Sequence, residues 1–126
     1  MDPAAYRQIL LNLLDNAVKY GPSGQTITVR LARVGGSVRL AIEDEGPGVP
    51  EGEHERIWGP FVRLTTTRHG PMGTGIGLAV VRDLAVRHGG RAWVENVARG
   101  GARFVVEMPA TSSAKEMGQE SVRAAL

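Results

Sequence analysis

The chain has 126 residues, of which 42% are hydrophobic and 22% are charged. This length supports one domain around a single core and excludes a multidomain array. A formal net charge of +2 is too small to argue for binding to nucleic acid or to a membrane surface. The absence of cysteine excludes disulfides and thiolate metal sites. Without a signal peptide or an apolar run near the ~18 residues that span a bilayer, we expect a cytoplasmic domain.

The N-terminal third predicts a helix followed by a β-hairpin. The helix begins near Pro3, a residue suited to the first helical position, and ends at Gly21-Pro22. Residues 25–34 and 37–43 then alternate between apolar and polar side chains, which is typical of half-buried strands. The intervening Gly35-Gly36 suits a tight hairpin turn.

The rest of the chain predicts a long loop, a second helix and a second hairpin. Residues 44–77 are rich in glycine, proline and threonine, with one helical turn expected near Glu53–Trp58. A weakly structured connection of this length is usually a lid or a binding loop. An apolar stripe predicts a helix over 76–88, and alternation predicts strands at 91–97 and 102–108.

This order of elements predicts an α/β (α+β) two-layer sandwich. A mixed, mostly antiparallel sheet would be covered on one face by helices. We expect residues 1–109 to form the domain and the polar residues 110–126 to form a flexible C-terminal tail. Because the chain begins directly in a helical pattern, we also expect it to be a segment of a longer protein.

The first helix carries a polar stripe of Asn12, Asn16 and Lys19. Asparagine is a poor helix former, so two of them four residues apart in mid-helix suggest a function. Their amide oxygens are suitable ligands for Mg²⁺, and a lysine one turn away can neutralise a phosphate. The alternative is a solvated helix face with an ordinary Asp15–Lys19 ion pair.

Two glycine-rich motifs follow. In Asp44-Glu45-Gly46-Pro47-Gly48, a carboxylate at a strand end can point into a cleft, and the glycines let a flat ligand approach the backbone. Gly73-Thr74-Gly75-Ile76-Gly77-Leu78 runs into the second helix, whose free N–H groups and positive dipole end suit phosphate. Taken singly, each motif is also compatible with a plain loop.

In this order, the motifs resemble the Bergerat-fold ATP-binding domain, and most of all the catalytic domain of bacterial two-component sensor histidine kinases. Asn12–Tyr20 is similar to the N box of that family and Asp44–Gly48 to its G1 box. Ile57–Arg63 is similar to the F box, and Gly73–Leu78 to the G2 box. The resemblance covers residues 2–109. The sequence lacks the strand that usually precedes the first helix in this family.

The resemblance implies that the chain binds ATP and Mg²⁺. Asn16 would be the main protein ligand of the metal ion, and Asn12 would assist it. The phosphates would be contacted by side chains and backbone of the N box, F box and G2 box, namely Lys19, Arg63, Gly73, Thr74, Gly75 and Gly77.

The adenine would lie on the other side of the site. The resemblance implies that Asp44 accepts a hydrogen bond from the adenine amino group. The remaining pocket residues would pack against the base or shape the space around it, namely Tyr20, Gly46, Gly48 and Leu78. Residues 50–72 would form a lid, with His54 exposed on it.

The implied reaction is transfer of the ATP γ-phosphate to a histidine on a separate dimerisation domain of the parent protein. No catalytic residue is expected within this chain, because the acceptor histidine is absent. A response regulator would receive the phosphate next in the phosphorelay. Two alternatives stay open: a serine kinase of the anti-sigma-factor type, and a nucleotide-binding module without transfer activity.

Overall fold

The structure is a computed structural model that describes residues 3–59, 77–110 and 119–125. These described residues form two α-helices, two short 3₁₀ turns and five strands. In chain order they are α1 (Pro3–Tyr20), β1 (Thr26–Val34), β2 (Ser37–Glu43), η1 (Glu51–Glu53), η2 (Arg56–Trp58), α2 (Gly77–Arg87), β3 (Arg91–Asn96), β4 (Ala102–Pro109) and β5 (Gln119–Ala125).

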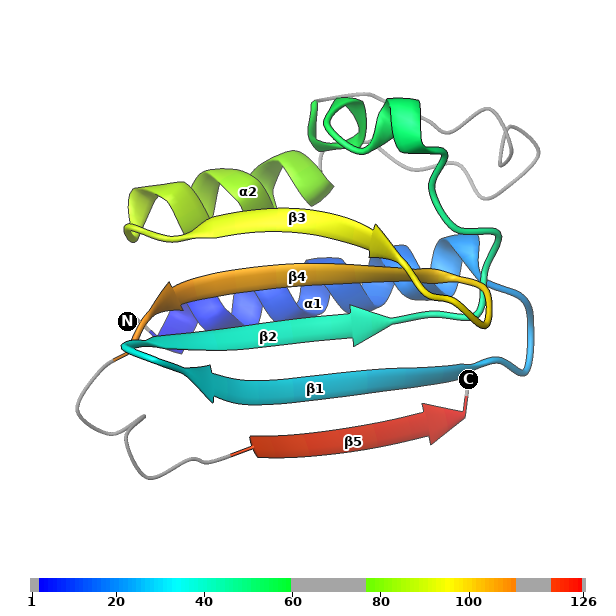
Figure 1. Ribbon diagram of the computed structural model, residues 1–126, viewed down its shortest axis with the longest axis horizontal. Helices are drawn as coiled ribbons and strands as arrows, with labels where there is room; N and C mark the ends of the chain where they lie inside the picture. The colour runs from blue at the N-terminus through cyan, green and yellow to red at the C-terminus, as the bar shows by residue number, and fades with distance from the viewer. Residues whose placement is uncertain (1–2, 60–76, 111–118, 126) are drawn as a thin grey trace.

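The strands form one sheet in the order β3-β4-β2-β1-β5. Every pairing between the described strands is antiparallel. In Figure 1, α1 passes behind the sheet and α2 lies beside β3, so the helices leave the face toward the viewer uncovered. The predicted two-layer α+β sandwich is therefore confirmed, and the described part of the sheet is antiparallel throughout.

Local sequence explains where the elements end. Val34 pairs with Ser37, which leaves Gly35-Gly36 as a two-residue turn, and Gly35 has a φ of +61° that only glycine adopts without strain. At the end of α2, the Gly90 N–H donates to the Ala85 carbonyl oxygen at 2.8 Å, a bond that satisfies an otherwise unpaired carbonyl of the last helical turn.

The core lies between the helices and the inner face of the sheet. Ile9 and Leu13 of α1 and Val81 of α2 are fully buried there. They meet Ile42 of β2 and Val106 of β4, which are equally inaccessible. Because these strand residues belong to the alternating apolar set, this packing is the one that the sequence pattern predicts.

Residues 119–125 differ from the flexible tail that we expected. They form β5, which pairs with β1 from Thr26↔Ala125 to Ala32↔Gln119. Without β5, β1 would be an edge strand with a row of unpaired N–H and C=O groups, and a polar segment can satisfy these groups through its backbone alone. Polar composition therefore does not predict β5, because a strand that pairs at a sheet edge through its backbone needs no apolar side chains.

Candidate functional site

Asp44 lies directly after β2, and its carboxylate is buried, with 6% of the residue exposed. One oxygen, Oδ1, accepts hydrogen bonds from the Gly46 N–H at 2.9 Å and the Ala102 N–H at 3.1 Å. Burial raises the pKa of Asp44, and the two backbone hydrogen bonds oppose that rise. Within the described residues Oδ2 has no hydrogen-bond partner, so one carboxylate oxygen is fixed and the other is available.

The two glycines of the same motif lie against backbone and side-chain oxygens. A Cβ at Gly46 would lie 3.0 Å from the Tyr20 carbonyl oxygen. A Cβ at Gly48 would lie 2.9 Å from Oδ1 of Asn96. The loop after β2 therefore packs directly against the end of α1 and the end of β3, which explains why this motif needs glycine.

Two side-chain amides that sequence reasoning missed fasten this loop, one buried (Gln25) and one at the exposed end of β3 (Asn96). The Asn96 side chain donates to the Val49 carbonyl and accepts from the Val49 N–H, both at 2.8 Å. Gln25, which is 3% exposed, donates to the Ala17 carbonyl at 2.8 Å and accepts from the Glu45 N–H at 3.0 Å. Neither residue belongs to a recognisable motif, so no sequence signal singles them out.

The polar stripe of α1 faces the start of α2. Asn12 donates to the Gly77 carbonyl at 3.3 Å, and its Oδ1 accepts from the Gln8 amide at 3.0 Å. Asn12 thereby links the two helices, a structural contact that the motif did not predict. The Asn16 amide is half-buried and has no hydrogen-bond partner among the described residues.

Lys19 forms the ion pair with Asp15 that the simpler interpretation of this stripe predicts, with Nζ and Oδ2 2.9 Å apart. Both side chains are partly exposed, and an i, i+4 pair of this kind contributes only ~0.3–0.5 kcal/mol. A phosphate could therefore displace Asp15 at little cost. The ion pair is compatible with either role for Lys19.

The remaining predicted site residues divide into two groups. Tyr20 ends α1, Gly77 begins α2, and Leu78 packs partly buried against the core. The N-box helix, the loop after β2 and the start of α2 are thus brought together. The other predicted phosphate contacts lie outside the described residues: Arg63, Gly73, Thr74 and Gly75.

The segment before the undescribed residues 60–76 is anchored to the domain. Trp58 is 4% exposed and packs edge-on against Phe104, with ring centroids 6.1 Å apart. Arg82 of α2 lies over the Trp58 ring and binds the Glu55 carboxylate at 2.6 and 3.2 Å. His54 is half-buried and lies 2.9 Å from the Val49 carbonyl, and is thus less exposed than we expected.

Comparison with known proteins supplies the family. A family model described as histidine kinase-, DNA gyrase B-, and HSP90-like ATPase matches residues 1–112. The chain belongs to this family. The match spans all four boxes and confirms the resemblance drawn from them.

The chain is similar to curated sensor kinases. The chain is 45% identical over 109 residues to the adaptive-response sensory kinase SasA of Synechococcus sp. strain CC9311, and the match covers 86% of this chain and 28% of SasA. SasA of Parasynechococcus marenigrum strain WH8102 is 42% identical over the same length, again with 28% of that protein covered. The chain therefore spans less than a third of these relatives.

Solved structures agree with that grouping. The mycobacterial sensor histidine kinase MprB matches with a TM-score of 0.76 and 32% identity, over 86% of this chain and 72% of that one. Full-length ShkA in complex with AMPPNP matches with a TM-score of 0.69 and 39% identity, over 83% of this chain and 21% of that one.

Neither α1 nor α2, the two α-helices of the described residues, combines the length and the apolar character that a membrane span requires.

Proposed function

We propose that the chain binds Mg-ATP and is the catalytic part of a sensor histidine kinase in a two-component system. The observation that carries this proposal is the Asp44 carboxylate, buried at the end of β2 with one oxygen fixed by two backbone N–H groups and the other unpaired among the described residues. The similarity to SasA and to the AMPPNP-bound ShkA structure supports it.

In this proposal, Asp44 recognises adenine. Its available Oδ2 would accept a hydrogen bond from the exocyclic amino group, which guanine lacks at that position. Gly46 and Gly48 would leave room for the base, while Tyr20 and Leu78 would pack against it. A buried acceptor whose partner is missing is costly, so such a site discriminates strongly between bases.

The family also implies a magnesium ion, and the residues present fit one. The Asn16 amide oxygen is half-buried and unpartnered within the described part of the chain. The described residues contain no cluster of three or more acidic, histidine or cysteine side chains, so the protein would supply few ligands, as is usual where Mg²⁺ bridges to phosphates and waters. When bound, the ion would neutralise charge on the phosphate oxygens.

The protein's own contribution to transfer would be positioning and charge neutralisation. Lys19 would exchange Asp15 for a phosphate. Asn12 would hold the start of α2 against α1 through its hydrogen bond to Gly77, and would assist Asn16 at the metal ion only indirectly. Arg63 and the backbone from Gly73 to Gly77 would contact the phosphates. The acceptor would be a histidine on a dimerisation domain of the same parent protein, and a response regulator would receive the phosphate from it.

We expect Asn16→Ala to abolish the strengthening of ATP binding by Mg²⁺. The variant removes the one unpartnered amide oxygen of the described stripe, so ATP should bind equally with and without the ion. Isothermal calorimetry of ATP with Mg²⁺ or with a chelator measures this difference. Adenosine is the control: its affinity should stay within about twofold of the wild type, because it carries no phosphate for the ion to bridge. An equal loss of adenosine binding would make Asn16 a structural residue.

A further inference from the structure

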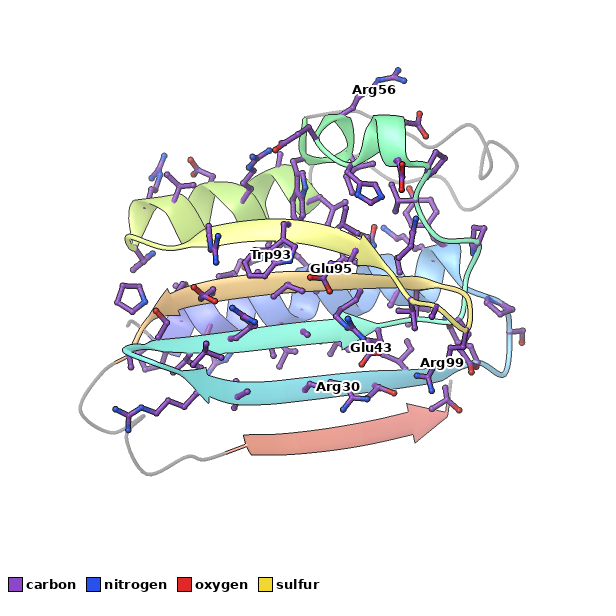
Figure 2. All side chains as sticks on the ribbon, in the orientation of Figure 1. Arg30, Glu43, Arg56, Trp93, Glu95 and Arg99 are labelled. Carbon is purple, nitrogen blue, oxygen red and sulfur yellow. The ribbon has the colours of Figure 1, made fainter. Side chains whose placement is uncertain are left out.

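The helix-free face of the sheet carries a charged network at the end of the strands where Asp44 lies. Glu43, Glu95, Arg30, Arg99 and Trp93 lie on the face toward the viewer in Figure 2, with α1 behind the sheet. Glu43 immediately precedes Asp44, yet its side chain is on this opposite face and is only 2% exposed. A carboxylate this buried requires compensating partners.

Arginines from three parts of the chain compensate Glu43. Arg30 of β1 donates from Nε to Oε2 of Glu43, and Arg103 of β4 donates to Oε1 at 3.2 Å. Arg99, in the turn between β3 and β4, lies 3.9 Å from the same oxygen. Burial alone would raise the pKa of Glu43, but the hydrogen bonds from Arg30 and Arg103 outweigh it and the pKa is lowered. The carboxylate is thus stabilised in its charged form.

The network continues from β2 across β4 to β3. Arg103 also donates to Oε1 of Glu95 on β3 at 2.9 Å, and the Trp93 indole N–H donates to Oε2 of Glu95 at 2.9 Å. The strand register aligns these groups, because Glu43 pairs with Arg103 and Arg103 pairs with Glu95. One row of charged side chains therefore joins β2, β4 and β3.

The residue pair next to Glu43 and Arg103, Asp44 and Ala102, forms the next rung between these strands, and this rung fixes the Asp44 carboxylate. The Asp44 N–H donates to the Ala102 carbonyl at 3.0 Å, and the Ala102 N–H returns to the Asp44 carboxylate. This rung is the last between β2 and β4, and it adjoins the turn residue Gly101, whose φ of +94° is a glycine conformation. Terminal rungs beside flexible turns open most readily, unless a neighbouring contact restrains them.

We infer that Glu43 is a positioning residue for Asp44: through its ion pair with Arg103 it locks the β2–β4 rung from which Ala102 orients the adenine-binding carboxylate. This inference rests on the proposed function, since it assigns Asp44 the recognition of adenine. The two rungs are consecutive in both strands, so a displacement at Glu43 and Arg103 is transmitted over one residue, about 3.3 Å. Because its side chain lies on the helix-free face, Glu43 would act through Ala102 and not by direct contact with the nucleotide.

The test compares Glu43→Gln with Glu107→Gln. Glu107 is the central carboxylate of a similar cluster on the same face, paired with Arg39 at 2.8 Å and Arg91 at 3.5 Å. It lies four residues along β4 from Arg103, about 13 Å away, so its loss should lower stability without reaching Asp44. Both variants are studied at a temperature at which circular dichroism shows them fully folded.

Two readouts are measured, both by methods that report on folded protein. Amide exchange in the nucleotide-free protein should be about tenfold faster at Ala102 and Gly46 in Glu43→Gln and unchanged there in Glu107→Gln, a difference of ~1.4 kcal/mol in opening. Calorimetry should show about tenfold weaker ATP binding in Glu43→Gln only. If Glu43→Gln fails to fold, Glu95→Gln replaces it in the test. This variant weakens the ion pair that holds Arg103 on the β3 side, and it should shift both readouts in the same direction by about threefold.

The outcomes separate this inference from the proposed function. Equal effects of Glu43→Gln and Glu107→Gln on the Ala102 amide, or unchanged ATP affinity in Glu43→Gln, would overturn the positioning role. If the wild-type chain binds no ATP, the proposed function fails, and the exchange rate of the Ala102 amide still decides whether Glu43 restrains Asp44.

Discussion

Replacing Asp44 by asparagine should weaken ATP and ADP binding together, by about tenfold to a hundredfold. A hydrogen bond to a charged group is worth ~1.5–3 kcal/mol, and the variant exchanges a carboxylate that accepts from the adenine amino group for an amide that must be turned to do so. ATP and ADP share the base, so the loss should be equal for both. Calorimetry with each nucleotide in the presence of Mg²⁺ measures it.

GTP is the matched control for this substitution. In the wild type its carbonyl oxygen would face the Asp44 carboxylate, so GTP should bind far more weakly than ATP. In Asp44→Asn the amide N–H₂ can face that carbonyl, and the preference for ATP should shrink. Equal affinities of ATP and GTP in the wild type would remove Asp44 from base recognition altogether.

Of the substitutions proposed for this chain, Trp58→Ala should lower the free energy of unfolding most, by about 3–5 kcal/mol. It deletes a buried aromatic side chain and leaves a cavity that cannot fully close. Trp58 is 4% exposed, packs edge-on against Phe104, and lies under the Arg82 guanidinium. Domains are typically stable by only ~5–15 kcal/mol, so this variant should unfold at much lower urea concentration. Urea unfolding followed by circular dichroism measures the change in free energy.

The control for this prediction is the other tryptophan. Trp93 is partly exposed on the helix-free face, where it is flanked by Arg39 and Arg91 and donates to Glu95. Trp93→Ala should cost less than half as much, because less apolar surface leaves the protein interior. If both substitutions lowered the free energy of unfolding equally, Trp58 would not be the anchor between η2 and the core.

Local pattern predicted the elements well because each depends on neighbours in sequence. The apolar stripe of α1, the alternation of β1 and β2, and the turn at Gly35 all follow from side-chain periodicity and backbone conformation. The place of Asp44 directly after a strand was also predictable, since a carboxylate followed by two glycines at a strand end is a local arrangement. The order of the four boxes along the chain then identified the family, which the family model confirms.

Contacts between distant segments were not predictable in the same way. The partners of Glu43 lie on β1, on β4 and in a turn, and only strand register brings them together. Asn96 and Gln25 are single amides without a motif, and their roles depend on which backbone groups approach them. β5 escaped prediction for a related reason: its pairing with β1 uses backbone groups, which every sequence has.

We expect neither of the two histidines in the described residues, His54 and His88, to accept phosphate. Transfer needs an acceptor held about 3–3.5 Å from the phosphorus and in line with the leaving oxygen. The His54 ring lies against the Val49 carbonyl, and the His88 ring lies 2.8 Å from the Leu84 carbonyl. His88 follows the last turn of α2, about 16 Å along the helix from Gly77. The third histidine, His69, lies outside the described residues.

The most direct measurement of the proposed function is transfer of label from γ-labelled Mg-ATP. The chain is incubated alone and with the phosphoacceptor domain of a sensor kinase, supplied as a separate polypeptide. We predict no acid-labile phosphate on the chain alone, and acid-labile phosphate on the added domain only when the chain and Mg-ATP are both present. Label on a histidine of the chain itself, acid-stable label on serine, or ATP binding without any transfer would each contradict the account.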